Sequence, residues 1–489
     1  MRKSLAKMSH ATSAAWLVFG FFLLLGASWA VVQPPYGVSD EPAHAIKALA
    51  TANGQFSGPS VVGPFGYAAQ EFQVPSAYAE IWHFVCYNSD VNTTPSCAPP
   101  FPNGDNRIAL PSTAAEYPPL YYGLVGWAGW IFPGKSGLLQ MRLLTVLLVA
   151  ALLGWAASRL PRRNLAWTVT GLLLAMTPVV LAFTGSVNPF GPEIAAAVLF
   201  WVSCLRVANE GETDISRSDV VGLHVSAILL GLFRPASFLW IIIIVLMVSI
   251  SMLAKSGSTF VDVVGKGRPI CWAAVVGVLP SLTWFFFAMT GKSLGGGSPA
   301  GGSTWTNMSI SFWRTDEYLQ QAIGYFGWTS FKLPVILMSI GSILLVCLAI
   351  AARDGGRQLF TAGLLITLFA ACGPAILEGA RASVAGFGFQ GRYLLPVLCG
   401  LPILLSVLTG TRELSQSLGR SFLVLAVTLQ LASLFYVGKR FAVGLDGTNL
   451  WVLKSEWPGL LTELWRNVLL LGTCATGAAL AMFVAQTKE

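Results

Sequence analysis

The sequence predicts an all-α polytopic membrane protein, and its composition is the first reason. Of its 489 residues, 54% are hydrophobic and only 11% are charged, whereas charged residues make up roughly a quarter of an ordinary soluble domain. The mean hydropathy is +0.66. A soluble core could not bury this much apolar surface, so a soluble enzyme, a disordered chain and a small disulfide-rich domain are excluded. The apolar runs are continuous rather than alternating, which favours membrane helices over a β-barrel.

About twelve apolar segments have the length of a membrane-spanning helix, roughly 17–25 residues. The first begins after basic residues, but its apolar run is longer than that of a usual signal peptide, so we expect a retained helix. Arg234-Pro235 divides one long apolar stretch into two segments, with a kinked helix and a re-entrant turn as the alternative. The expected segments are 13–32, 138–158, 164–183, 191–208, 218–233, 236–254, 270–290, 334–351, 358–377, 392–409, 421–438 and 467–485.

Lysine and arginine residues set the expected orientation. If Arg2, Lys3 and Lys7 are cytoplasmic, alternation of the segments places the other short basic loops on the same side. We therefore expect a multi-pass protein of the cell membrane with both termini in the cytoplasm. The net charge of +8 comes largely from these loops. No basic patch is interleaved with aromatic residues, so no nucleic-acid partner is expected.

Three segments on the outer side are too long to be simple turns, and they divide the chain into five parts. These parts are 1–32 with the first helix, 33–137 as an extracytoplasmic loop with interfacial helices, 138–290 with helices 2–7, 291–333 as a Gly-rich outer loop, and 334–489 with helices 8–12 and an outer loop near 439–466.

Two of the eight cysteines, Cys86 and Cys97, lie in the large outer loop, and the other six lie in expected membrane helices. A disulfide between these two fits an oxidising exterior. Two free thiols are the alternative.

The motif Tyr36–His44 (YGVSDEPAH) directly follows the first apolar segment and contains two carboxylates and an imidazole. Pro42 is typical of the first turn of a helix, which places Asp40, Glu41 and His44 on one face. Two interpretations stay open: the carboxylates cap the helix and interact with its dipole, or they act in catalysis at the membrane boundary. The same three side chains are the expected ligands if a divalent cation, Mg²⁺ or Mn²⁺, is required.

Two further motifs are expected near the same boundary. In EYPPLYY, the residues Glu116, Tyr117 and Tyr121 precede a short apolar aromatic stretch, and they either anchor the interface or line an acceptor pocket. In GSVNPFGPE, Asn188 begins a turn and Glu193 lies at the start of the next apolar segment. These two residues either form a turn and cap or, because an acid near a membrane helix is typical of functional sites, take part in binding.

Three arginines are candidates for binding an anion. Arg392 follows Gln390 in the motif QGRYLLP, and Arg381 lies nearby. Each is either a snorkelling anchor or a phosphate ligand, because the planar guanidinium donates parallel hydrogen bonds. Arg234 lies within an apolar run and therefore requires a partner. The segment GFGFQG, which overlaps the start of QGRYLLP, matches the nucleotide-binding pattern G-x-G-x-x-G. No expected strand precedes it, so we attribute the match to chance.

Taken in order, the acidic pair, the large outer loop, PPLYY, the NP turn and GRYLLP resemble the GT-C superfamily of membrane glycosyltransferases that use polyprenyl-phosphate sugars. The resemblance is to a bacterial, actinobacterial branch. It implies a GT-C-like bundle with a large outer loop subdomain and an inverting reaction. It also implies a carboxylate base at Asp40, with Glu41 as its neighbour or substitute. Arg392, then Arg381 and Arg234, would bind the donor phosphate.

The expected activity is therefore transfer of a sugar from a polyprenyl-phosphate donor to a glycan or lipid-linked acceptor of the cell envelope, on the extracytoplasmic face. Related GT-C enzymes often have His where this chain has Glu116. A flippase or transporter of lipid-linked sugars, a polysaccharide polymerase or ligase, and a non-catalytic scaffold are the alternatives. The expected acceptor-side residues are His44, Glu116, Tyr117, Tyr121, Asn188, Glu193 and Gln390.

Overall fold

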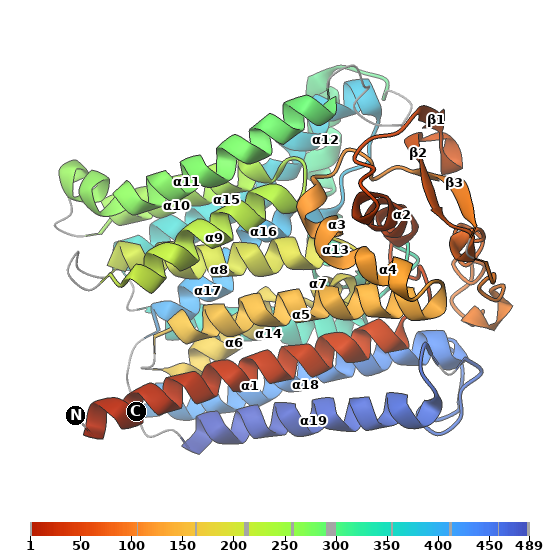
Figure 1. Ribbon diagram of the computed structural model, residues 1–489. Coiled ribbons are helices and arrows are strands. Elements are labelled where there is room, and N and C mark those ends of the chain that lie inside the picture. The colour runs from red at the N-terminus through yellow and green to blue at the C-terminus, as the bar shows by residue number, and fades with distance from the viewer. Residues whose placement is uncertain are drawn as a thin grey trace.

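The long helices of the computed structural model run side by side in one bundle (Figure 1). The helix α1 (Arg2–Val32) begins, and α19 (Glu463–Gln486) ends, at one end of this bundle, which we call the termini end. A three-stranded sheet lies at the opposite end, the sheet end. Because α1 begins and α19 ends at the same end, the chain crosses the bundle an even number of times. The structure describes residues 2–104, 106–161, 164–209, 215–255, 259–289, 300–353, 356–409, 413–457 and 459–486.

Most expected membrane segments coincide with bundle helices. Across the described ranges, seven helices are long and apolar enough to cross a membrane, or eight if one bent pair counts as a single span. Three shorter apolar helices, within Ser237–Leu253, Val335–Ala351 and Gly391–Val407, match further expected segments. The count of about twelve stays a prediction. The remaining bundle helices are α5 (Lys135–Arg159), α6 (Leu165–Ala175), α7 (Pro178–Thr184), α8 (Phe190–Asn209), α9 (Arg217–Phe233), α10 (Ser237–Leu253), α11 (Phe260–Met289), α14 (Val335–Ala351), α15 (Gly356–Ala385), α16 (Leu395–Leu398), α17 (Gly400–Val407) and α18 (Glu413–Val443).

The segment expected at 164–183 is a broken helix. The helices α6 and α7 meet at an angle of 68°, because Pro178 has no backbone N–H and disfavours helical geometry in the residue before it. The break leaves carbonyl groups without helical partners. Nε2 of the buried Gln430 on α18 donates to the carbonyls of Leu173 and Met176, at 2.9 Å each. The side chain therefore stabilises the break from the neighbouring helix.

The Arg234-Pro235 dipeptide separates two helices, as the sequence predicted. The helices α9 and α10 pack against each other, and both contact α8 and α11. Arg234 itself has extended backbone (φ −141°). The alternative of one kinked helix with a re-entrant turn is not found.

Residues 33–134 form a layer of short helices and one antiparallel sheet at the sheet end (Figure 1). In the sheet order β1-β2-β3, Phe72 of β2 faces Leu110 of β3. Phe72 and Val74 are buried and belong to the main core, and β2 contacts α2. The structure confirms the disulfide between Cys86 and Cys97. The elements are α2 (Glu41–Ala52), β1 (Ser60–Val62), β2 (Ala68–Pro75), β3 (Arg107–Ser112), α3 (Pro119–Val125) and α4 (Trp127–Ile131), with 3₁₀ turns at Pro64–Gly66, Ser76–Tyr78 and Pro95–Cys97.

A second group of elements lies at the sheet end between α11 and α14. It consists of α12 (Thr304–Trp313), α13 (Thr315–Gly324) and a hairpin of β4 (Tyr325–Phe326) and β5 (Phe331–Lys332). On α12, Trp305 and Trp313 are exposed whereas Asn307 and Ser311 are buried. Exposed tryptophans are typical of the membrane–water interface. Residues 290–299, which include the start of the expected Gly-rich outer loop, lie outside the described residues.

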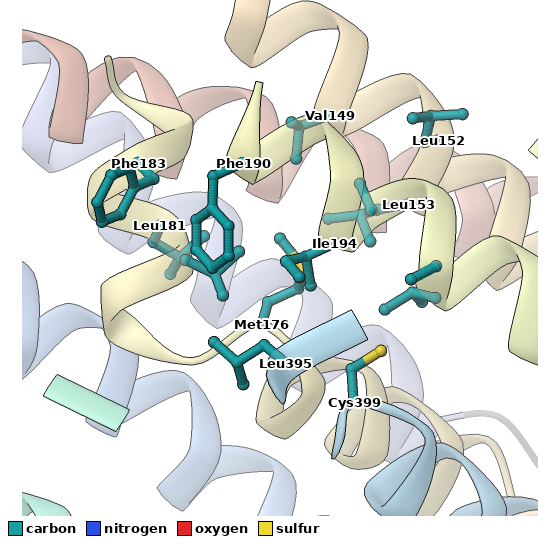
Figure 2. Close-up of a cluster of buried hydrophobic side chains, with 14 of the residues drawn as sticks. Val149, Leu152, Leu153, Met176, Leu181, Phe183, Phe190, Ile194, Leu395 and Cys399 are labelled. Carbon is teal, nitrogen blue, oxygen red and sulfur yellow. The ribbon is translucent and has the colours of Figure 1, made fainter. Parts of the chain in front are cut away.

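The hydrophobic core lies between the helices. Figure 2 shows one part of it, where Phe183 of α7 and Phe190 of α8 lie close together, with ring centres 5.0 Å apart. Leu395 and Cys399 lie nearby in the same cluster. These rings form the floor beneath the candidate site.

Candidate active site

Asp40 lies at the turn between α1 and α2, where the chain leaves the bundle at the sheet end. Its backbone is left-handed (φ +66°), and its side chain makes no capping hydrogen bond to α2. The carboxylate is instead 45% exposed, and its Oδ2 accepts a 2.7 Å hydrogen bond from Nη2 of Arg392. Capping of α2 by this side chain is therefore not found.

Arg392 comes from the 3₁₀ turn Gly391–Leu394, 352 residues after Asp40 in the chain. Its guanidinium lies 4.4 Å from the centre of the Phe183 ring. A cation over an aromatic face is stabilised electrostatically, and the ring excludes water from that side. The arginine is thus buried on one side and donates to an open carboxylate on the other.

Glu378 of α15 holds the loop that precedes Arg392. Its Oε1 accepts hydrogen bonds from the backbone N–H groups of Gly388 and Phe389, at 2.6 and 2.7 Å. Its Oε2 accepts a hydrogen bond from the hydroxyl of Tyr318 on α13. Glu378 is 1% exposed, so these bonds compensate for the burial of its carboxylate.

The glycines of the GFGFQG segment have a packing role. The backbone N–H of Gly391 donates to Oε1 of Gln321 at 2.8 Å. A Cβ atom on Gly391 would lie only 1.7 Å from the carbonyl oxygen of Tyr318. Gly391 is therefore required for close contact with α13, which places the next residue, Arg392, beside Asp40.

Glu41 has a different environment from its neighbour. It is completely buried, and Arg142 of α5 donates to its Oε1 and Oε2 at 2.7 and 2.6 Å. The backbone N–H of Val187 donates to the same Oε1 at 2.9 Å. Both carboxylate oxygens of Glu41 therefore accept hydrogen bonds from other groups of the protein.

His44 lies one helical turn after Asp40, and its Nδ1 is 2.7 Å from the hydroxyl of Tyr122. The rings of His44 and Tyr117 pack edge to face, with their centres 4.9 Å apart. Burial lowers the pKa of His44 to about 3; nearby Asp40 opposes this shift, and Arg234 adds to it. The imidazole is therefore neutral at physiological pH.

Arg234 has the partner that its place in an apolar run requires. Its Nη1 donates to Oε2 of Glu193 at 3.0 Å, and the hydroxyl of Ser237 donates to Oε1 of the same carboxylate at 2.6 Å. The guanidinium lies 4.9 Å from the ring centre of Tyr393 and 5.9 Å from that of Tyr117. Arg392 lies 5.5 Å from the same Tyr393 ring.

These contacts join the candidate residues into a closed ring at the sheet end. A small recess beside the ring is lined by Ser39, Gln390 and Arg392 together with the β4–β5 hairpin residue Gly327. Each member of the ring contacts the next, and the backbone N–H of His44 closes the ring by donating to the Asp40 carbonyl. In order, the members are Asp40, Arg392, Tyr393, Arg234, Tyr117 and His44.

The other candidates lie outside this ring. The hydroxyl of Tyr121 is 2.8 Å from that of Thr145 in the core. Asn188 accepts from the backbone N–H of Phe190 and thus forms the predicted turn. Arg381 is exposed on α15 beside Gly388.

Glu116 is half-buried, and its carbonyl accepts a hydrogen bond from the indole N–H of Trp284 at 2.9 Å. This bond connects the EYPP segment to α11. The side-chain role that the sequence suggested for Glu116 stays a prediction.

The expected metal ligands are not brought together. Glu41 is bonded to Arg142 and His44 to Tyr122, so only Asp40 of the three presents an open oxygen. Over the part of the chain that the structure describes, no three His, Cys, Asp or Glu side chains lie close enough to hold a metal ion. A role for a divalent cation bound by Asp40, Glu41 and His44 stays a prediction.

Sequence reasoning missed several residues that build the site. Arg142 lies in an apolar span, and an arginine in such a span is a signal that would have found it. Glu378 carries the same signal, because it is an acid within the apolar helix α15, one residue after the expected segment 358–377. Tyr122 and Tyr393 gave no signal beyond the motifs that contain them.

The model of one protein family, described as "Predicted membrane protein (DUF2142)", matches residues 22–401. The chain belongs to this family. The matched region includes Asp40, the Arg142–Glu41 pair, the Glu193–Arg234 pair and Arg392. No match is found among curated proteins.

Among solved structures, the chain is similar to ArnT from Cupriavidus metallidurans in the apo state. The two share 13% sequence identity with a TM-score of 0.42, over 99% of this chain and 78% of that chain. The activity proposed below does not depend on this similarity.

Proposed function

We propose that this protein is an inverting membrane glycosyltransferase with Asp40 as its general base and a polyprenyl-phosphate sugar as its donor. The observation that carries the proposal is the half-exposed Asp40 carboxylate in contact with a buried arginine, Arg392, at the end of a membrane bundle. An inverting transferase needs these two groups, a base for the acceptor and a cation for the leaving phosphate.

The proposed reaction is a single displacement. An Asp40 oxygen takes the proton from an acceptor hydroxyl while that oxygen attacks the anomeric carbon. The bond from this carbon to the phosphate oxygen breaks, and the polyprenyl phosphate leaves with the electron pair. Arg392 donates hydrogen bonds to the phosphate, which gains negative charge as the bond breaks.

The free protein holds base and cation against each other, so donor binding has a consequence for the base. When the donor phosphate accepts from Arg392, the guanidinium leaves Asp40, and the carboxylate becomes free to accept a proton. Arg234 already neutralises Glu193, and Arg381 is exposed. Arg392 is therefore the first phosphate ligand in this proposal, followed by Arg381 and then Arg234.

The surroundings of the pair support a lipid-linked donor. An apolar cavity lies between α6, α7, α13, α14, α15, α16, α17 and α18, and its lining includes Leu395, Ala322 and Pro178. Along the chain, Pro178 and Ala322 are next to Val179 and Gln321, which line the Arg392 recess, and Leu395 lies three residues after Arg392. The isoprenoid tail of a donor would lie on the side of the apolar cavity, and its sugar would lie on the side of the recess, with the phosphate at Arg392. On the acceptor side, Tyr117, His44 and Gln390 offer rings and polar groups.

The test is a transfer assay on purified protein with a panel of polyprenyl-phosphate sugars and cell-envelope acceptor glycans, with and without EDTA. Wild-type protein should transfer a sugar, and Asp40→Asn should lose at least about 1,000-fold in rate. Asp316→Asn, an exposed acid on α13 at the same end, is the matched control and should keep the wild-type rate.

Other outcomes separate the alternatives. Donor binding without transfer to any acceptor, together with donor movement across sealed vesicles, would favour a flippase. Formation of long products would favour a polymerase. Equal activity of wild type and Asp40→Asn would reject the assigned base. The EDTA arm decides whether a divalent cation takes part.

A further inference from the structure

Arg142 makes five hydrogen bonds, which is the full number that a guanidinium can donate. Two go to the carboxylate of Glu41, as described above. The other three go to backbone carbonyls in the last turn of α1 and just after it: Nη1 donates to Ala30 and Gln33 at 2.8 and 2.9 Å, and Nη2 donates to Pro34 at 2.7 Å. Both side chains are completely buried.

These bonds enclose the segment that carries Asp40. The carbonyls of Gln33 and Pro34 lie at its start, and Glu41 lies at its end. One guanidinium therefore fixes the separation of the two ends of a segment only nine residues long, residues 33–41. The segment has little freedom left to move Asp40 relative to α5.

The segment between these ends is strained. Tyr36 and Asp40 both have positive φ, +61° and +66°, a conformation that costs non-glycine residues free energy. Such a conformation persists only where surrounding bonds hold it. Here the indole N–H of Trp328 donates to the Tyr36 carbonyl at 3.1 Å, and the Ser39 hydroxyl donates to the Gly327 carbonyl at 2.8 Å.

The left-handed turn at Asp40 also separates two adjacent carboxylates. Glu41, the first residue of α2, faces the core and Arg142. Asp40, one residue earlier, faces the recess side and Arg392. The inward bonds of Glu41 fix the first residue of α2, and they thereby set the direction of the Asp40 side chain that precedes it.

We propose that Arg142, acting through Glu41 and the carbonyls of residues 30–34, is a positioning residue that holds Asp40 at the distance and angle needed for base catalysis. This inference rests on the proposed function of Asp40. Arg142 does not touch the substrate, and it acts only through the placement of residue 40. Its loss should therefore lower the rate of the chemical step without weakening donor binding by Arg392.

The test variants are Arg142→Lys and Glu41→Gln. A lysine has three donors on one nitrogen and cannot replace the planar set of five, and a glutamine keeps the shape of Glu41 without its charge. We expect kcat to fall about 100-fold, as a misplacement of about 1 Å can cause, without an increase in donor KM. The matched control is Arg440→Lys, because Arg440 is a buried arginine that donates to the carbonyls of Tyr87, Asp90 and Thr93 at the same end.

A double-mutant cycle distinguishes positioning from a general structural role. If Arg142 acts only through Asp40, then Arg142→Lys should change the residual rate of the Asp40→Asn protein by less than about 2-fold. An equal loss in both backgrounds, or a loss of donor binding that matches the loss of kcat, would overturn the inference.

Amide hydrogen exchange gives a readout that needs no activity. In Arg142→Lys, exchange should increase at the backbone N–H groups of Gly37, Ser39 and Glu41, which are bonded within or next to the segment. In Arg440→Lys it should increase at residues 87–93 instead. If the wild-type protein transfers no sugar, the proposed function fails; unchanged exchange at residues 37–41 of Arg142→Lys overturns the inference in either case.

Discussion

Two adjacent acids in this chain differ in chemistry because of their surroundings. Glu41 is completely buried and has both oxygens bonded to Arg142, whereas the neighbouring Asp40 is half-exposed with one hydrogen bond, from Arg392. A base must be able to exchange a proton with a substrate, so exposure decides between them. The ion pair of Asp40 is also the weaker one, because water screens it.

Asp40→Asn should bind a polyprenyl phosphate more tightly than wild type, although it transfers the sugar far more slowly. In the wild-type protein, the phosphate must displace the Asp40 carboxylate from Arg392. A half-exposed ion pair contributes up to about 1 kcal/mol, which corresponds to roughly fivefold in Kd. Calorimetric titration with the polyprenyl phosphate measures this, with Arg392→Gln as the opposite variant. Weaker binding by Asp40→Asn would contradict the competition.

Burial of His44 predicts sensitivity to acid. Its pKa is about 3 in the folded protein, against an ordinary value of 6.5. Below pH 6.5 the unfolded chain takes up a proton that the folded protein does not, so the free energy of unfolding falls as the pH falls towards 3. Between pH 6.5 and 5 the loss should be about 2 kcal/mol, and no such loss occurs above pH 6.5.

Thermal unfolding of wild type and His44→Gln across this pH range checks the effect. The variant should lose less stability on acidification than the wild type. His83, which is 75% exposed, provides the control, since His83→Gln should keep the wild-type acid sensitivity. Identical pH profiles for wild type and His44→Gln would show that another group is responsible.

At the scale of elements, the sequence predicted helices well and their interruptions in part. Long charge-poor runs can form only helices in a membrane, so α1, α5, α8 and α19 were found. The Arg234-Pro235 break was also found, because proline has a strong local effect. The 68° bend at Pro178 was missed, since its stability depends on Gln430 of α18, 252 residues later in the chain.

Gly391→Ala should lower activity through the placement of Arg392. A Cβ at position 391 would meet the Tyr318 carbonyl oxygen at 1.7 Å, so the loop must move away from α13. A loss of about 10- to 100-fold in transfer is expected if the guanidinium moves by up to about 1 Å. Gly363→Ala on α15 has no atom within 4 Å of its Cβ and should keep both activity and stability. Wild-type transfer by Gly391→Ala would reject the packing role.

Removal of the Cys86–Cys97 disulfide should destabilise the layer at the sheet end. The two cysteines are 11 residues apart, and closing a loop of this size is worth about 3 kcal/mol. Arg440 holds the carbonyls of Tyr87, Asp90 and Thr93 in the same loop, so the measured loss should not exceed that value. Thermal unfolding of the double Cys→Ala variant measures it, with Cys474→Ala as the control; equal stability of the two variants would contradict the prediction.

At the scale of the whole molecule, the candidate site joins segments that are distant in the chain. Composition and motif order predicted which segments carry functional groups, and Asp40, Arg392, Arg234 and Glu193 were all selected. The sequence could not assign partners, because the pairs Asp40–Arg392 and Glu41–Arg142 depend on how α2, α5 and the loop after α15 pack. The buried Glu41–Arg142 pair and the open Asp40–Arg392 pair contain the same residue types, and only burial distinguishes the two.

The placement of the site relative to the membrane gives the last prediction. The Cys86–Cys97 disulfide and the Asp40–Arg392 pair lie at the same end of the bundle, opposite the start of α1. Disulfides persist in oxidising compartments, and the short basic loops favour a cytoplasmic termini end. Both arguments predict that the sheet end is extracytoplasmic, where a lipid-linked sugar rather than a nucleotide sugar is the available donor.

Cysteine labelling on intact cells tests this orientation. Asn103→Cys at the sheet end and Lys255→Cys after α10 both introduce a cysteine at an exposed position, in a background where the exposed Cys271 and Cys372 are alanine. A membrane-impermeant maleimide should label Asn103→Cys directly and Lys255→Cys only after permeabilisation. The reverse pattern would place Asp40 in the cytoplasm. The donor argument would then fail even if the geometry of base and cation were correct, because nucleotide sugars are available on that side.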